Sequence, residues 1–160
     1  MAHNDHAPAL GAVSGIATLN GSTEVVQSPA SKLIPRWLKF TVAESAFTAA
    51  ATTEDVELFI LAAGGVIHGV KIKHSASFTG GTLSAFTLSV GITGTLAKYA
   101  SAFDVFQAAA GTTFQLTNTI GSEDHGATTS IRLAAVSVGD NVVAATAGSV
   151  DVWVLVSEAV

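Results

Sequence analysis

The side chains best suited to chemistry in this chain are its five histidines, and their spacing decides what they can do. His3 and His6 flank Asp5, but zinc needs donors held on a rigid scaffold, and the surrounding residues predict none. His68 and His74 fall on the same face of one predicted strand, roughly 20 Å apart at strand spacing, which is too far to share a metal ion. If that face is the core, His68 is expected to be a buried, hydrogen-bonded histidine. We therefore predict no metal site and no cofactor.

The remaining histidine, His125, follows Glu123 and Asp124 in the sequence GSEDHG. Adjacent oxygen and nitrogen donors are able to bind a cation, but a polar turn explains the same residues. The chain has no Gly-x-Ser-x-Gly motif to support a serine nucleophile. Asp55 and Glu57 share one strand face and are expected to be solvated edge charges, unlike the paired carboxylates of a glycosidase. The sequence predicts that the chain is not an enzyme.

The strongest binding signal lies in the segment SKLIPRWLKFTV, residues 31–42, where cations alternate with large apolar side chains. Its proline excludes a central strand position and favours a sheet edge or a turn. One interpretation is a docking segment for an acidic partner surface; the other is an ordinary amphipathic edge strand with its lysines in water. The candidate partner-binding residues are Lys32, Arg36, Trp37, Lys39 and Phe40.

The elements that position these residues are predicted to be strands, because apolar and polar side chains alternate strictly along most of the chain. In the first strand we expect Val56, Leu58 and Ile60 to share the inward face. A polar loop is expected at Ser75 to Gly81, and a turn at Gly139 to Asn141. The predicted strands are Thr53 to Leu61, Val66 to His74, Leu83 to Thr93, Thr112 to Thr117, Thr128 to Ala135 and Ser149 to Ser157.

Two segments depart from simple alternation. In Thr95 to Ala110, three aromatic rings (Tyr99, Phe103 and Phe106) recur at helical spacing and predict a short helix or a turn that caps the sheet. In the last strand, valines line one face and Asp151, Trp153 and Leu155 line the other. Because both faces are largely apolar, that strand is expected to be central or to be covered by another subunit.

About eight short strands separated by turn signals predict an all-β fold, namely an antiparallel β-sandwich with a jelly-roll-like topology and at most one short helix. Residues 1–30 are rich in Ala, Gly, Ser and Thr without sustained periodicity, and predict an extended, flexible N-terminal arm. Within this arm Ser22 to Val26 is a candidate strand. Residues 31–160 are predicted to form a single sandwich domain.

Composition bears on partners. Charged residues make up 12% of the chain, about half the usual share, and the mean hydropathy is +0.52. A monomer with so few charged residues would expose much apolar surface, so the composition predicts a homo-oligomer or an assembly subunit. The net charge of −5 argues against nucleic acid as a partner, and no apolar run is long enough to span a membrane.

Two stretches resemble small β-rich virion proteins of tailed bacteriophages. The first runs from residues 65–74, which begin with Gly-Val-Ile-His-Gly, through a Gly-Gly loop into residues 88–94, which end in Gly-Ile-Thr-Gly. The second is residues 147–156, with the sequence AGSVDVWVLV. In size and character the chain is most similar to capsid decoration, or cement, proteins. The resemblance spans roughly residues 55–157 and includes no catalytic motif.

The resemblance implies a homotrimer that binds the major capsid protein on the outer surface of the head and stabilises it by bridging capsid subunits. It implies a protein made in the host cytoplasm and located in the virion. One alternative is a tail-fibre or baseplate protein that binds a glycan, for which Trp37, Trp153, Tyr99 and the loop around His125 are the candidates. Another is a minor head or head–tail connector protein.

Overall fold

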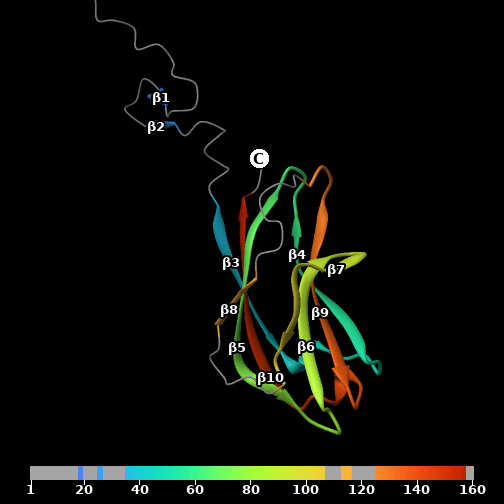
Figure 1. Ribbon diagram of the computed structural model, residues 1–160. Helices are drawn as coiled ribbons and strands as arrows, with labels where there is room; N and C mark the ends of the chain where they lie inside the picture. The colour runs from blue at the N-terminus through green and yellow to red at the C-terminus, as the bar shows by residue number, and fades with distance from the viewer. Residues whose placement is uncertain (1–17, 20–24, 27–34, 107–112, 117–124, 158–160) are drawn as a thin grey trace, which may run out of the picture.

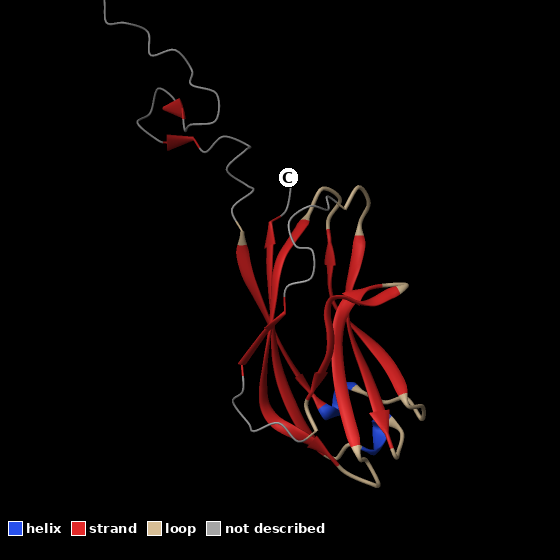
Figure 2. Cartoon of the chain, viewed as in Figure 1, coloured by secondary structure: helices blue, strands red, loops and turns tan. Residues whose placement is uncertain are grey.

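The computed structural model describes residues 18–19, 25–26, 35–106, 113–116 and 125–157, and nearly all of them lie in strands or the turns between strands (Figures 1 and 2). The short strands β1 (Thr18–Leu19) and β2 (Val25–Val26) pair with each other, and β2 falls within the segment predicted as a candidate strand. In the described part of the chain, no helix has the length and apolar character needed to cross a membrane.

The main body has two antiparallel four-stranded sheets. The first sheet has the order β3-β10-β5-β8 and the second has the order β4-β9-β6-β7. The first contains β3 (Arg36–Ala43), β10 (Ala147–Ser157), β5 (Val66–Thr79) and β8 (Thr113–Leu116). The second contains β4 (Thr53–Leu61), β9 (Thr129–Val138), β6 (Ala85–Ile92) and β7 (Thr95–Asp104). Short 3-10 helices follow β3 at Glu44–Ala46 and β9 at Val142–Ala144.

This arrangement confirms the predicted all-β antiparallel sandwich. Successive strands cross between the sheets except at the β6–β7 hairpin, which is the strand order expected of an eight-stranded jelly roll. β3 lies at the edge of its sheet directly after Pro35, as the proline predicts. β10 is central, as its two apolar faces predict.

The register of β10 places the first residue of β3 beside the end of β10, the last strand of the sandwich. Arg36, at the start of β3, pairs with Val156 near the end of β10. Thr79 and Ala147 pair at the opposite end, where β5 finishes and β10 begins. The chain therefore enters and leaves the sandwich at one end (Figure 1).

The core lies between the two sheets and is made by every second residue of the central strands. In β10, Val150, Val152, Val154 and Val156 are each fully buried. Burying a valine side chain contributes about 1.5 to 3 kcal/mol, so this row fixes which face of β10 points inward. A cluster of three rings, Phe47, Phe78 and Phe86, fills one region of the core, with centroids 4.9 to 6.2 Å apart.

The predicted helix at Thr95 to Ala110 is wrong for the residues that the structure describes, because Thr95–Asp104 form strand β7. Two irregularities in the pairing of β7 with β6 explain the misleading spacing. Phe103 faces Leu88 and Ala100 faces Val90, so β7 has one more residue than β6 across that interval. Such a bulge interrupts strict alternation and brings Tyr99, Ala100 and Phe103 all into the interior. Aromatic residues in an irregular strand thus acquire a spacing that imitates a helix.

A bulge in β4 changes which of its side chains face the core from the predicted pattern. The register shifts between Glu57 and Phe59, so Val56 and Phe59 face the interior and Ile60 is 58% exposed. Val56 and Leu58 both pack against the core, so the predicted inward grouping is confirmed for these two residues and wrong for Ile60. β5 also continues to Thr79, so most of the predicted loop at Ser75 to Gly81 belongs to a strand.

Two buried strand glycines differ in the space around them. A Cβ atom built on Gly91 would lie 2.2 Å from the carbonyl oxygen of Thr95, because the start of β7 crosses closely over β6 there. A Cβ atom built on Gly69 in β5 would lie 3.7 Å from the ring of Trp37, an ordinary contact distance. The backbone cannot move aside as a side chain can, so of these two positions Gly91 requires glycine and Gly69 does not.

We therefore expect Gly91→Ala to lower the free energy of unfolding by about 1 to 3 kcal/mol through overpacking. The matched variant Gly69→Ala is expected to leave it unchanged or raise it by up to about 1 kcal/mol, because alanine restricts the unfolded chain. Urea denaturation of both variants and the wild type measures the difference. Equal stability of the two variants would contradict this account of the β6–β7 crossing.

Candidate functional site

The structure separates the predicted partner-binding residues onto two faces of β3. Trp37 and Lys39 pair with Leu155 and Trp153, which lie on the outer face of the first sheet. Arg36 and Phe40 have the opposite, inward register; Arg36 is exposed at the end of the sandwich. Phe40 stacks on Phe59 of the second sheet, with ring centroids 5.4 Å apart and planes 5° apart. Lys32 lies outside the described residues. A partner-binding role for these five residues remains a prediction.

The outer face of the first sheet brings together side chains that are far apart in the sequence. Trp153 in β10 pairs with Lys39 of β3 on one side and with Lys71 of β5 on the other. The Nζ atom of Lys39 lies 5.3 Å from the centroid of the Trp153 ring, and that of Lys71 lies 5.2 Å from it. Both distances are typical of cation–π contacts, so the indole ring holds an ammonium group on each flank.

The next row of this face contains an ion pair between Asp151 and Lys39. Asp151 pairs with Thr41 and Lys73 across the strands, and its carboxylate accepts a hydrogen bond of 2.6 Å from the Thr41 hydroxyl. Lys39 Nζ lies 3.1 Å from the same carboxylate. Burial acts to raise the pKa of Asp151, but the Thr41 hydrogen bond, the Lys39 contact and the charge of Lys73 outweigh it and hold that pKa below its ordinary value.

Trp37 extends this face toward the end of the sandwich. It pairs with Leu155, which in turn pairs with Gly69, and the missing side chain of Gly69 leaves room beside the indole ring. Trp37 is 47% exposed, an unusual position for so large an apolar ring. We name this outer surface the lysine–tryptophan face, composed of Trp37, Lys39, Lys71, Lys73, Asp151 and Trp153.

The three histidines within the described residues do not converge on a common site. His68 is half-buried, and its Nε2 atom lies 2.8 Å from the Ser157 hydroxyl. The fully buried histidine is His74, whose two ring nitrogens have no hydrogen-bond partner in the described structure. Among the described residues, no group of three or more His, Cys, Asp or Glu side chains is arranged to hold a metal ion.

His125 connects the β4–β5 turn to strand β7 by hydrogen bonds. Its backbone forms two hydrogen bonds with the β4–β5 turn, at Gly64 and Gly65, and its Nε2 atom lies 2.6 Å from the hydroxyl of Tyr99 in β7. Glu123 and Asp124 lie outside the described residues, so the candidate cation site in GSEDHG remains untested.

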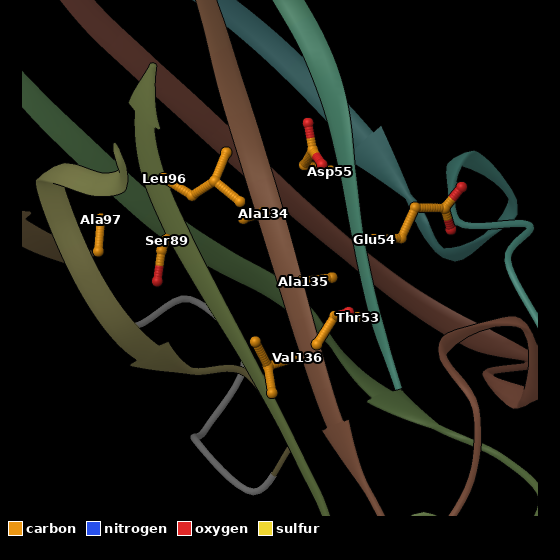
Figure 3. Close-up of a pocket in the computed structure, with 9 residues that line it drawn as sticks. All are labelled: Thr53, Glu54, Asp55, Ser89, Leu96, Ala97, Ala134, Ala135 and Val136. Atoms are coloured by element: carbon orange, nitrogen blue, oxygen red, sulfur yellow. The ribbon is translucent and has the colours of Figure 1, made fainter. Parts of the chain in front are cut away.

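A shallow groove of about 380 Å³ lies on the outer face of the second sheet (Figure 3). Its floor is made by small side chains such as Ser89, Ala134 and Ala97, and its two carboxylates already have partners. Asp55 forms an ion pair with Arg132, and Glu54 accepts a hydrogen bond of 2.9 Å from the backbone of Ala49. The groove is therefore lined mainly by small or apolar side chains, and both of its carboxylates are already engaged.

Comparison with known proteins gives a match in fold. No protein-family model matches the chain, and no curated protein sequence matches it. A chain in the structure titled "Cyanophage Pam1 capsid asymmetric unit" is similar in fold, with a TM-score of 0.58 and 24% identity, over 78% of this chain and 84% of that chain. A chain in the structure titled "Capsid of Ralstonia phage GP4" aligns over 79% of this chain and 86% of that one, with 18% identity and a TM-score of 0.47.

Sequence reasoning identified only the β3 half of the lysine–tryptophan face. The other half, Lys71, Lys73, Asp151 and Trp153, comes from β5 and β10. The signal for each strand was visible, because Lys71 and Lys73 alternate with apolar residues and Trp153 stands opposite the valine row. The missing information was the register that sets these strands side by side.

The lowered pKa of Asp151 makes a testable contribution to stability. A carboxylate with a depressed folded-state pKa stabilises the fold above its unfolded-state pKa, about 3.9, and this contribution is lost as pH falls through the folded value. Asp151→Asn is expected to lower the free energy of unfolding by about 1 kcal/mol near pH 7. Urea denaturation near pH 7 and near pH 2.5 is the measurement. The difference from wild type should shrink at the lower pH, and a difference independent of pH would contradict the assignment.

Proposed function

We propose that this chain is a structural protein of a tailed-phage virion, namely a trimeric decoration subunit that binds the outer surface of the capsid and stabilises the head by bridging major capsid subunits. The observation that carries the proposal is the shared fold with a chain of the Pam1 capsid asymmetric unit. That similarity covers most of both chains, and so concerns the whole sandwich domain.

The surface of the sandwich supports an assembled state. Five large apolar side chains of the described residues are exposed: Trp37, Ile60, Val136, Val138 and Val143 are 43% to 58% accessible. Val136 and Val138 lie two residues apart on β9. Val136 pairs with Thr53 of β4 and Thr87 of β6, and Val138 pairs with Ala85 of β6. Together with the low content of charged residues, this surface fits a subunit that covers part of itself with neighbours.

The N-terminal segment is the second part of the proposal. Residues 1–30 have the composition of an arm, and the sandwich begins just after them at β3. In a trimer, three arms would emerge together and engage the capsid simultaneously. Because linked contacts raise the effective concentration of one another, a weak contact by each arm produces strong attachment by the trimer.

The test is binding of the purified protein to heads that lack it, measured by co-sedimentation, with its mass in solution measured by light scattering. We expect a mass of about three times 16.1 kDa and saturable binding to heads. Deleting residues 1–30 should weaken head binding at least about tenfold through lost avidity while the trimer remains folded.

Full-strength head binding by the truncated protein would contradict the role of the arm. Failure of the intact protein to bind heads, or binding to isolated tails in their place, would overturn the decoration assignment and favour a tail component. Circular dichroism of both proteins is the control for folding.

A further inference from the structure

We propose that the lysine–tryptophan face is a docking surface for an acidic surface of a partner protein. The inference rests on the proposed function, because it takes the capsid protein as the source of that partner surface. The contact would join lysine and tryptophan side chains of the first sheet to carboxylates of the partner. Residues of β10 and β5 that lie outside the basic segment of β3 make the larger part of it.

The first argument is charge. The whole chain has a net charge of −5, yet the lysine–tryptophan face contains three lysines and one carboxylate. Three of the seven lysine and arginine residues of the chain are thus concentrated on one side of one sheet. A positive patch on a negative protein steers an acidic partner to this side and repels it from the others.

The second argument is preorganisation. Lysine side chains ordinarily lose conformational freedom on binding, which weakens their net contribution. Here the ammonium groups of Lys39 and Lys71 already lie against the Trp153 ring, and Lys39 also contacts Asp151. The two charges are therefore held on either side of Trp153, in the central strand β10, before any partner arrives.

The third argument is the apolar content of the face. Trp37 is 47% exposed beside Leu155, and Trp153 is half-buried in the next row. Tryptophan is the residue most enriched among those that dominate binding energy at protein interfaces, where the ring is buried against the partner. A partner that combines carboxylates with apolar contact area fits this face.

Other occupants fit less well. A nucleic acid would need a larger set of cations, and Asp151 would repel its phosphates from the centre of the face. A second copy of this chain would have to offer free carboxylates. On the outer face of the second sheet, Asp55 and Glu57 are already within ion-pair distance of Arg132.

The decisive experiment compares two charge reversals that change net charge equally. Lys71→Glu alters the lysine–tryptophan face, whereas Lys98→Glu alters β7 in the second sheet. Both lysines lie over an aromatic ring, since Lys98 Nζ is 5.9 Å from the centroid of Tyr99, so the two variants are matched in local chemistry. We expect Lys71→Glu to weaken binding to heads at least tenfold and Lys98→Glu to change it less than twofold. Thermal denaturation checks that both fold, and Lys39→Glu replaces Lys71→Glu if that variant does not.

The outcomes separate this inference from the proposed function. If the wild type fails to bind heads, the decoration assignment is wrong. If the wild type and both variants bind equally, the decoration assignment stands and the docking surface is overturned. Loss of self-association in Lys71→Glu by light scattering would also overturn the inference, because the occupant would then be a second copy.

A second measurement needs no capsid. Both tryptophans of the chain lie on this face, so Trp37→Phe leaves Trp153 as the only indole emitter. Poly-L-glutamate at low salt is expected to shift the emission of this variant, and the added Lys71→Glu change should abolish the shift. No shift with poly-L-glutamate, or a stronger response to a single-stranded DNA oligonucleotide, would contradict an acidic protein partner.

Discussion

The register of β10 is the constraint on which the rest of the molecule depends. Four valines on one side of this strand are fully buried, which leaves the alternate residues no position except the outer face. Because β10 is central, each of those residues has a neighbour on both sides, from β3 and from β5. A shift of one residue would bury Asp151 and Trp153 and expose the valine row, so core packing and surface chemistry are specified by the same alternation.

The outer faces of the two sheets differ in the chemistry of their side chains. The first displays lysines and tryptophans, while the second displays small side chains, isolated valines and a paired Asp55–Arg132–Glu57 cluster. A two-sheet sandwich permits this division because each sheet has one solvent-facing side whose residues scarcely affect the shared core. The two faces are free to contact different neighbours, as the proposed decoration role requires.

The sequence predicted most strands because period-two alternation depends only on neighbouring residues. It failed where bulges interrupt the alternation: Leu58 in β4 turns Ile60 outward, and the irregular pairing of β7 gives Tyr99 and Phe103 a helical spacing. For a related reason the sequence predicted only the β3 residues of the lysine–tryptophan face. Trp37 and Lys39 are two residues apart in the sequence, whereas Trp153 meets Lys71 only through a long-range register that no local pattern contains.

The shared exit of the two chain ends has a consequence for engineering. Arg36 and Val156 are paired, so a cargo domain fused after Ser157 would emerge beside the segment that leads into β3. On a surface held by that segment, such cargo would compete with the attachment for space. Peptides intended for display are better inserted at the far end of the sandwich, where β3 finishes at Ala43 opposite Ser149, near the start of β10.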